Sequence, residues 1–177
     1  MKQNNPKEIK QIEEWCELKC DDILFDSNVD NWSWNTLVLN ERIIGKKQLI
    51  FLIEDEDGEK FGYYLNTEVI EKYNKKFGDP PIETDNKSFE FNLQSNGRLQ
   101  QPMKFENKDL KKSGYYLYEK SRNWLIVLGD IYLYKENRKN ESYCNQCEDR
   151  FDYHVIKKAL CGKGLFTPKR ILVIQMK

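Results

Sequence analysis

The chain has 177 residues, and its 29 basic and 29 acidic side chains give a formal net charge of zero. This length predicts one domain over residues 1–177 and excludes two domains of full size. Aromatic residues make up 13% of the chain, which excludes a disordered protein that lacks core-forming side chains, and a single histidine excludes chemistry built on several imidazoles.

The location of the protein is constrained by what the sequence lacks. No apolar run approaches the roughly 20 residues of a membrane-spanning helix, and residues 1–10 are polar, unlike a signal peptide. Five cysteines, an odd number, indicate reduced thiols rather than a disulfide framework. We therefore expect a cytoplasmic or nuclear protein, with residues 1–6 as a flexible N-terminus.

The first part of the chain is predicted to contain two helices and one strand. A helix is expected over 7–20, where apolar residues recur at helical spacing between Lys and Glu. A short buried strand over 23–25 follows and ends in a turn. Over 33–44 the apolar spacing fits both a helix and a strand, and we favour a helix with Ser33 as its cap and Gly45 as its stop.

From residue 48 onward, strand patterns dominate. Runs over 48–53 and 60–65, joined by an acidic turn with Asp-Gly at its tip, predict a hairpin, and the polar connection after them contains a candidate helix over 67–76. Further strands are predicted over 88–93, 114–118, 124–128, 131–134 and 170–175. Strands that follow strands predict an α+β, mainly β fold, namely an antiparallel β-sandwich flanked by a few helices.

One short pattern resembles a calcium loop. Asp26, Asn28 and Asp30 occupy the first, third and fifth positions of such a loop. Asn31 and Leu37 stand where the loop needs its glycine and its bidentate glutamate. An Asx-rich turn is therefore the favoured interpretation.

A second pattern concerns thiols. Cys144 and Cys147 have the spacing of a zinc knuckle, and His154 and Cys161 are near enough in sequence to complete four candidate ligands. No second CxxC or HxxxH pattern accompanies them, so we predict no metal site and no cofactor. A redox dithiol formed by Cys144 and Cys147 is an alternative that stays open.

Familiar catalytic motifs are absent from the sequence. It contains no P-loop, GxGxxG, HExxH or GxSxG pattern, and nothing marks a nucleophile beside His154. The acidic run over 54–59 is interpreted as the solvated tip of a hairpin rather than as a paired-carboxylate site. We therefore predict a protein that is not an enzyme.

The charges are distributed unevenly along the chain. Residues 153–177 contain six basic and no acidic side chains, although the whole chain is neutral. A candidate basic face for phosphate, a lipid headgroup or an acidic partner contains Lys157, Lys158, Lys163, Lys169 and Arg170. The alternative is a solvated edge of the fold that contacts nothing.

Segments spread over roughly residues 10–176 together resemble a TLDc domain. A strand, a turn and a helix are followed by a hairpin, and a glycine-aspartate pair and a late glycine precede the last strands. The fold-defining residues of this pattern are Asp26, Trp32, Gly58, Phe61, Gly62, Gly129, Asp130 and Gly162. The order of these pieces carries the resemblance, and it covers nearly the whole chain.

The resemblance implies a function as well as a fold. TLDc domains are β-sandwiches of eukaryotic proteins that protect against oxidative stress, and several members bind and regulate the vacuolar proton ATPase. No agreed catalytic site accompanies the family. We therefore expect a non-enzymatic interaction module with a protein partner. The alternatives are a nucleic-acid-binding regulator that uses the basic stretch, which zero net charge disfavours, and a thiol redox enzyme.

Two predictions concern single residues. Gly62 and Gly129 interrupt aromatic-rich strand runs, so each is expected to have a positive φ or a close strand approach. Trp32 and Trp34 stand two positions apart at a predicted helix start and point in different directions. One of them is therefore expected in the core and the other near the surface.

Overall fold

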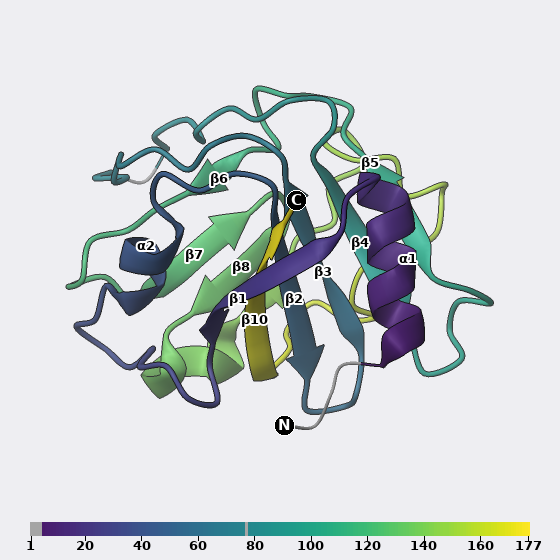
Figure 1. Cartoon of the computed structure of the whole chain (residues 1–177), viewed down its shortest axis with the longest axis horizontal. Coiled ribbons are helices and arrows are strands. Elements are labelled where there is room, and N and C mark those ends of the chain that lie inside the picture. The colour runs from purple at the N-terminus through teal and green to yellow at the C-terminus, as the bar shows by residue number, and fades with distance from the viewer. Residues whose placement is uncertain (1–4, 77) are drawn as a thin grey trace.

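The computed structural model describes residues 5–76 and 78–177, which form two antiparallel sheets packed face to face (Figure 1). In spatial order, the large sheet contains β1 (Cys20–Asp26), β10 (Pro168–Met176), β2 (Leu49–Asp55), β3 (Lys60–Leu65), β4 (Phe89–Gln94) and β5 (Met103–Glu106). The small sheet contains β6 (Tyr115–Tyr116), β7 (Trp124–Leu128), β8 (Ile131–Tyr134) and β9 (Tyr143–Cys144). The predicted mainly β sandwich is confirmed, and β5 and β9 are the strands that were not predicted.

The helices of the described residues are short. They are α1 (Pro6–Cys16), α2 (Val38–Ile43) and the 3-10 helix η1 (Glu136–Glu141). None of the helices in residues 5–76 and 78–177 has the length and apolar composition needed to cross a membrane. The helices lie outside the two sheets, as predicted (Figure 1).

The main core lies between the two sheets. Phe51 of β2 and Phe61 of β3 belong to one buried cluster with Leu128 of β7 and Leu133 of β8. The outer face of the large sheet has a second cluster, in which Ile12 of α1 packs with residues of β2, β4 and β10. Alternate residues of a strand point to opposite faces, so the large sheet is apolar on both sides.

Local capping determines where α1 begins and ends. The side-chain oxygen of Asn5 accepts the backbone N–H of Lys7 at 3.1 Å, and Pro6 is the first helical residue. The helix ends at Cys16 because Glu17 adopts a left-handed conformation with φ of 57°. The predicted helix over 7–20 is confirmed without its last turn. Asn5 caps the helix and Pro6 begins it, so these two residues are not part of a flexible terminus; residues 1–4 lie outside the described residues.

Two helix predictions are corrected by the structure. α2 begins at Val38 rather than at Ser33, because the side chain of Asn31 accepts the Ser33 N–H at 2.9 Å and makes a turn there. The stop at Gly45 is confirmed by its φ of 75°. No helix forms over 67–76, where the backbone instead bonds to distant segments. Tertiary pairing overrides the weak helical preference of this segment.

The first strand differs from the prediction in its exposure. β1 is an edge strand that pairs with β10 alone in the sheet order, and its residue Ile23 is 54% exposed. Within the predicted run over 23–25, Phe25 is the residue that is fully buried. An edge position leaves one side of the strand without a neighbour, so its side chains are only partly covered.

The predictions for Gly62 and Gly129 are confirmed. A Cβ atom on Gly62 would collide with the carbonyl oxygen of Phe51 on the neighbouring strand. Gly129 has a φ of 55°, and a Cβ atom there would lie 2.6 Å from Oε1 of Glu90. Gly62 therefore needs to be glycine because the neighbouring strand approaches it closely. Gly129 needs to be glycine both because of its positive φ and because of close neighbours.

The two tryptophans have different roles, as predicted. Trp32 is 5% exposed and belongs to the main core, whereas Trp34 is 52% exposed. We expect Trp32→Ala to lower the free energy of unfolding by about 3–5 kcal/mol, because it removes a large buried side chain. Trp34→Ala should change it by less than about 0.5 kcal/mol. Urea titrations of both variants test this, and similar losses in both would contradict it.

Candidate functional site

A cluster of buried polar groups connects the two sheets. Glu90 of β4 and Asp130 of the turn between β7 and β8 are both fully buried. The hydroxyl of Tyr153 lies 2.5 Å from Glu90 Oε2 and 2.8 Å from Asp130 Oδ2. The backbone N–H of Asp130 donates to Glu90 Oε1 at 2.7 Å, and Arg150 donates to Asp130 Oδ1 at 3.0 Å.

The cluster favours a bound proton. Burial, and then the negative charge of Asp130, raise the pKa of Glu90 well above its ordinary value. Burial also raises the pKa of Asp130, against hydrogen bonds from Tyr153 and Cys147 and the charge of Arg150. The Tyr153 hydroxyl has one proton and two carboxyl neighbours, so a protonated Glu90 that donates to it completes the network.

This cluster is closed to solvent, so we interpret it as a structural link rather than as a binding site. It nevertheless has one connection to the surface. The Arg150 guanidinium that bonds to Asp130 also lies 3.5 Å from the hydroxyl of Tyr132, which is partly exposed on the small sheet. The buried cluster therefore supports the outer face of that sheet.

The outer face of the small sheet is covered with aromatic rings. On β8, Ile131 and Leu133 point into the core, whereas Tyr132 and Tyr134 alternate with them and are half-buried. We call the six half-buried rings on this side the aromatic face: Tyr116, Tyr118, Trp124, Tyr132, Tyr134 and Tyr143. A solvated sheet face usually carries polar side chains, so this composition is unusual.

The rings of the aromatic face pack against one another. Tyr132 and Tyr143 are stacked with ring centres 4.4 Å apart, and the ring centres of Trp124 and Tyr134 are 3.9 Å apart. Tyr118 also stacks on Trp124, with ring centres 6.0 Å apart. Such contacts hold the rings in place, and burial raises the pKa of Tyr143 to about 12.

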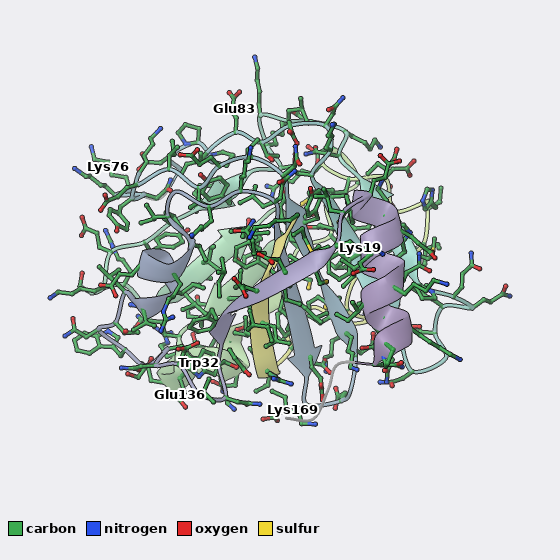
Figure 2. The ribbon with its side chains drawn as sticks, in the orientation of Figure 1. Lys19, Trp32, Lys76, Glu83, Glu136 and Lys169 are labelled. Carbon is green, nitrogen blue, oxygen red and sulfur yellow. The ribbon has the colours of Figure 1, made fainter. Side chains whose placement is uncertain are left out.

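A cavity of about 320 Å³ opens between this face and a neighbouring loop. We call it the aromatic pocket. All rings of the aromatic face except Tyr134 line one side of it. The remaining lining residues include Lys75, Lys76, Asp79 and Arg122, and Figure 2 shows the Lys76 side chain at the edge of the molecule. The volume and the aromatic lining are typical of a binding pocket.

The predicted calcium pattern forms a turn, as the favoured interpretation expected. Asp26 Oδ1 accepts the N–H of Asn28 at 3.0 Å, and Asp30 Oδ2 accepts the N–H of Asp26 at 2.8 Å. Arg170 makes two bonds to the Asp26 carboxylate, at 3.1 and 2.7 Å, and lowers its pKa. Asp26 therefore attaches β1 to β10.

The candidate basic face is divided by ion pairs. Lys163 lies 3.1 Å from Asp55, Lys169 lies 2.8 Å from Glu54, and Arg170 pairs with Asp26. Lys157 and Lys158 are exposed. Three of the five cations thus have carboxylate neighbours from β1 and β2, which weakens the support for a phosphate-binding surface there.

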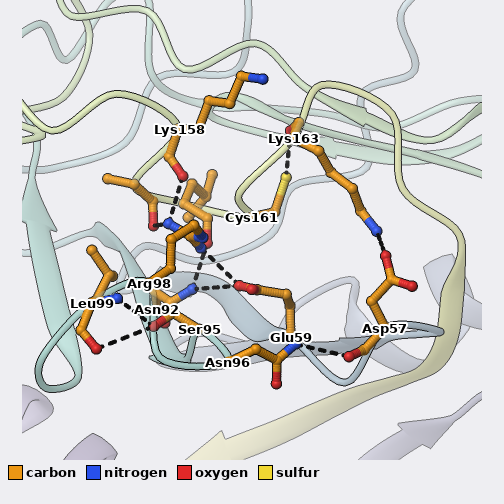
Figure 3. A network of polar contacts seen from close by, with 12 residues as sticks. Asp57, Glu59, Asn92, Ser95, Asn96, Arg98, Leu99, Lys158, Cys161 and Lys163 are labelled. Carbon is orange, nitrogen blue, oxygen red and sulfur yellow. Dashed lines mark hydrogen bonds and ion pairs between the residues drawn. The ribbon is translucent and has the colours of Figure 1, made fainter.

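The acidic run over 54–59 is not fully solvated, which corrects its interpretation. Asp55 and Glu59 are buried, and Asp55 Oδ1 accepts the N–H of Glu59 at 2.9 Å. Arg98 donates to Glu59 at 2.7 Å (Figure 3). Arg98 also bonds to the carbonyl of Lys158 at 2.8 Å. The turn glycines Gly58 and Gly162, with φ of 83° and 75°, border this structural network.

Of the candidate zinc ligands, Cys144 and Cys161 contact each other, but no third candidate joins them among the described residues. Burial raises the pKa of Cys144 well above its ordinary value, a hydrogen bond with Cys161 raises it further, and burial also raises the pKa of Cys147. His154 is exposed on a loop. Within residues 5–76 and 78–177, no three His, Cys, Asp or Glu side chains are grouped so that they could hold a metal ion. Protonated thiols are poor nucleophiles, so the dithiol alternative gains no support.

Sequence reasoning missed the aromatic face, although a signal for it was present. Tyr116 and Tyr118, like Tyr132 and Tyr134, are separated by one residue within a predicted strand, and residues at that spacing in a strand point to the same face. Composition alone assigns the aromatic residues to the core. No family model and no curated protein matches this chain. Its function must therefore be inferred from the geometry of the site itself.

Proposed function

We propose that this protein is a non-enzymatic interaction module that binds a partner protein through its aromatic face. The observation that carries the proposal is the set of six half-buried rings on the outer side of the small sheet. Tyr, Trp and Arg are the residue types that contribute most to protein–protein binding energy. Rings that are already packed lose little conformational freedom when a partner binds.

The resemblance to TLDc domains supports a more specific proposal about the process, the location and the partner of this module. In this proposal, it acts in the oxidative-stress response of the cytoplasm or nucleus, and the vacuolar proton ATPase is the first partner to test. The weakened basic face and the raised pKa values of Cys144 and Cys147 favour this reading over nucleic-acid binding and over thiol chemistry.

Crosslinking from the aromatic face tests the proposal. A photoreactive phenylalanine at position 134 should crosslink a discrete protein in lysate of the source cell, whereas the same residue at position 23, an exposed position on the edge of the large sheet, should not. The purified partner, with the vacuolar ATPase tested directly, should bind Trp124→Ala at least about tenfold more weakly. Ile23→Ala is the control and should bind normally. Equal crosslinking from both positions, or unchanged binding by Trp124→Ala, would refute the proposal.

A further inference from the structure

The loop wall of the aromatic pocket is positively charged. Lys75, Lys76 and Arg122 line the cavity and are exposed. Arg122 donates to the backbone carbonyl of Lys75 at 2.8 Å, so the loop and the start of β7 are held together. No ion pair joins any of these three cations to another described residue.

The one carboxylate of the pocket offsets only part of this positive charge. Asp79 is the one acidic side chain among the described lining residues. Its Oδ2 atom accepts the backbone N–H groups of Lys75 and Lys76, each at 3.0 Å, and these bonds lower its pKa. Asp79 therefore shapes the loop, and the pocket is lined by three cations and one carboxylate, a net excess of positive charge.

The rings restrict what kind of anion can bind. Single-stranded nucleic acids bind by stacking bases on open ring faces. Here Tyr132 and Tyr143 cover each other at 4.4 Å, and Trp124 is in contact with Tyr134 at 3.9 Å. Packing of this kind covers part of the ring faces, and the ring edges and hydroxyl groups suit the amides and apolar side chains of a peptide. The zero net charge of the chain also disfavours a polyanionic nucleic acid.

Building on the proposed function, we propose that the partner inserts an acidic, extended segment of its chain into the aromatic pocket. Its carboxylates pair with Lys75, Lys76 and Arg122, and an adjacent apolar side chain packs against Trp124 and the tyrosines. Charge complementarity of this kind selects the partner and speeds its association. The occupant is thus a protein segment rich in Asp or Glu with at least one aromatic or aliphatic residue.

Fluorescence anisotropy with synthetic peptides tests the inference. The probe is a labelled peptide of Asp, Glu and Phe, and its counterpart has Lys and Arg in place of the acids, with an oligo-dT strand as the competing polyanion. At about 0.05 M salt, where charges are weakly screened, the full chain should bind the acidic peptide at least tenfold more tightly than either comparison. The double charge reversal Lys75→Glu with Lys76→Glu should invert the peptide preference. The matched control, Lys157→Glu with Lys158→Glu, should leave the preference unchanged.

Three results would overturn the inference. The first is no binding of the acidic peptide, and the second is a preference for the acidic peptide that is the same in the Lys75→Glu, Lys76→Glu variant as in the parent chain. The third is that the parent chain binds oligo-dT more tightly than the acidic peptide and the variant loses this binding. These failures differ from failure of the proposed function. If crosslinking from position 134 still captures a partner that Trp124→Ala loses, the module is correct and the chemistry assigned to its occupant is wrong.

Discussion

Replacing Gly62 by alanine is expected to lower the free energy of unfolding by at least about 3 kcal/mol, a large part of the stability of an ordinary domain. Gly62 lies in the middle of β3, opposite Leu52 of β2 and Phe91 of β4. An added Cβ atom would collide with the Phe51 carbonyl oxygen and lie 2.7 Å from Cζ of Phe91. The Phe91 ring can shift, but a backbone carbonyl in the centre of a sheet cannot move without breaking strand pairing.

A second glycine provides the matched control. Gly164 is exposed, and a Cβ atom there would have no neighbour within 4 Å. Gly164→Ala should therefore change the free energy of unfolding by less than about 0.5 kcal/mol. Denaturant titrations of the two variants and the parent chain measure both values. Equal stability of Gly62→Ala and the parent would show that β2 and β3 do not approach as closely as described.

The stability of the protein should fall as pH rises above the ordinary carboxyl range, and Glu90→Gln should remove much of that dependence. The pKa of Glu90 is raised in the folded state by burial and by Asp130. Above about pH 4.3, the unfolded chain releases the proton that the folded chain retains, so unfolding becomes more favourable with rising pH until the folded pKa is passed. One retained proton gives a slope of up to about 1.4 kcal/mol per pH unit.

The glutamine variant isolates this effect because it preserves the hydrogen bonds. Its side-chain oxygen can accept the N–H of Asp130, and its amide N–H can donate to the Tyr153 hydroxyl as the protonated acid does. Urea titrations between about pH 5 and 8 should show a smaller slope for Glu90→Gln than for the parent chain. Glu83→Gln, at an exposed side chain seen at the edge of the molecule in Figure 2, should keep the parent slope. Identical slopes for Glu90→Gln and the parent would contradict the raised pKa.

Sequence patterns were sufficient for most of the strands and for their antiparallel arrangement. The hairpin of β2 and β3 was predictable because two apolar runs flank an Asp-Gly turn, and both the runs and the turn are local properties. The same holds for the stop at Gly45, where the conformational preference of a single residue decides. The different burial of Trp32 and Trp34 was predicted from a helix start that the structure places elsewhere, so their spacing alone did not decide it.

Other features depend on contacts between residues far apart in the chain, and only the tertiary structure decided them. The segment over 67–76 is not helical because its backbone bonds to distant partners. Glu90 is buried because β4 turns that residue toward the small sheet, where Asp130 and Tyr153 complete its hydrogen bonds. A pattern of alternating residues shows that Tyr132 and Tyr134 share one face of β8, but not whether another layer covers that face. Here no further sheet packs on the small sheet among the described residues, so its rings line a pocket instead of a core.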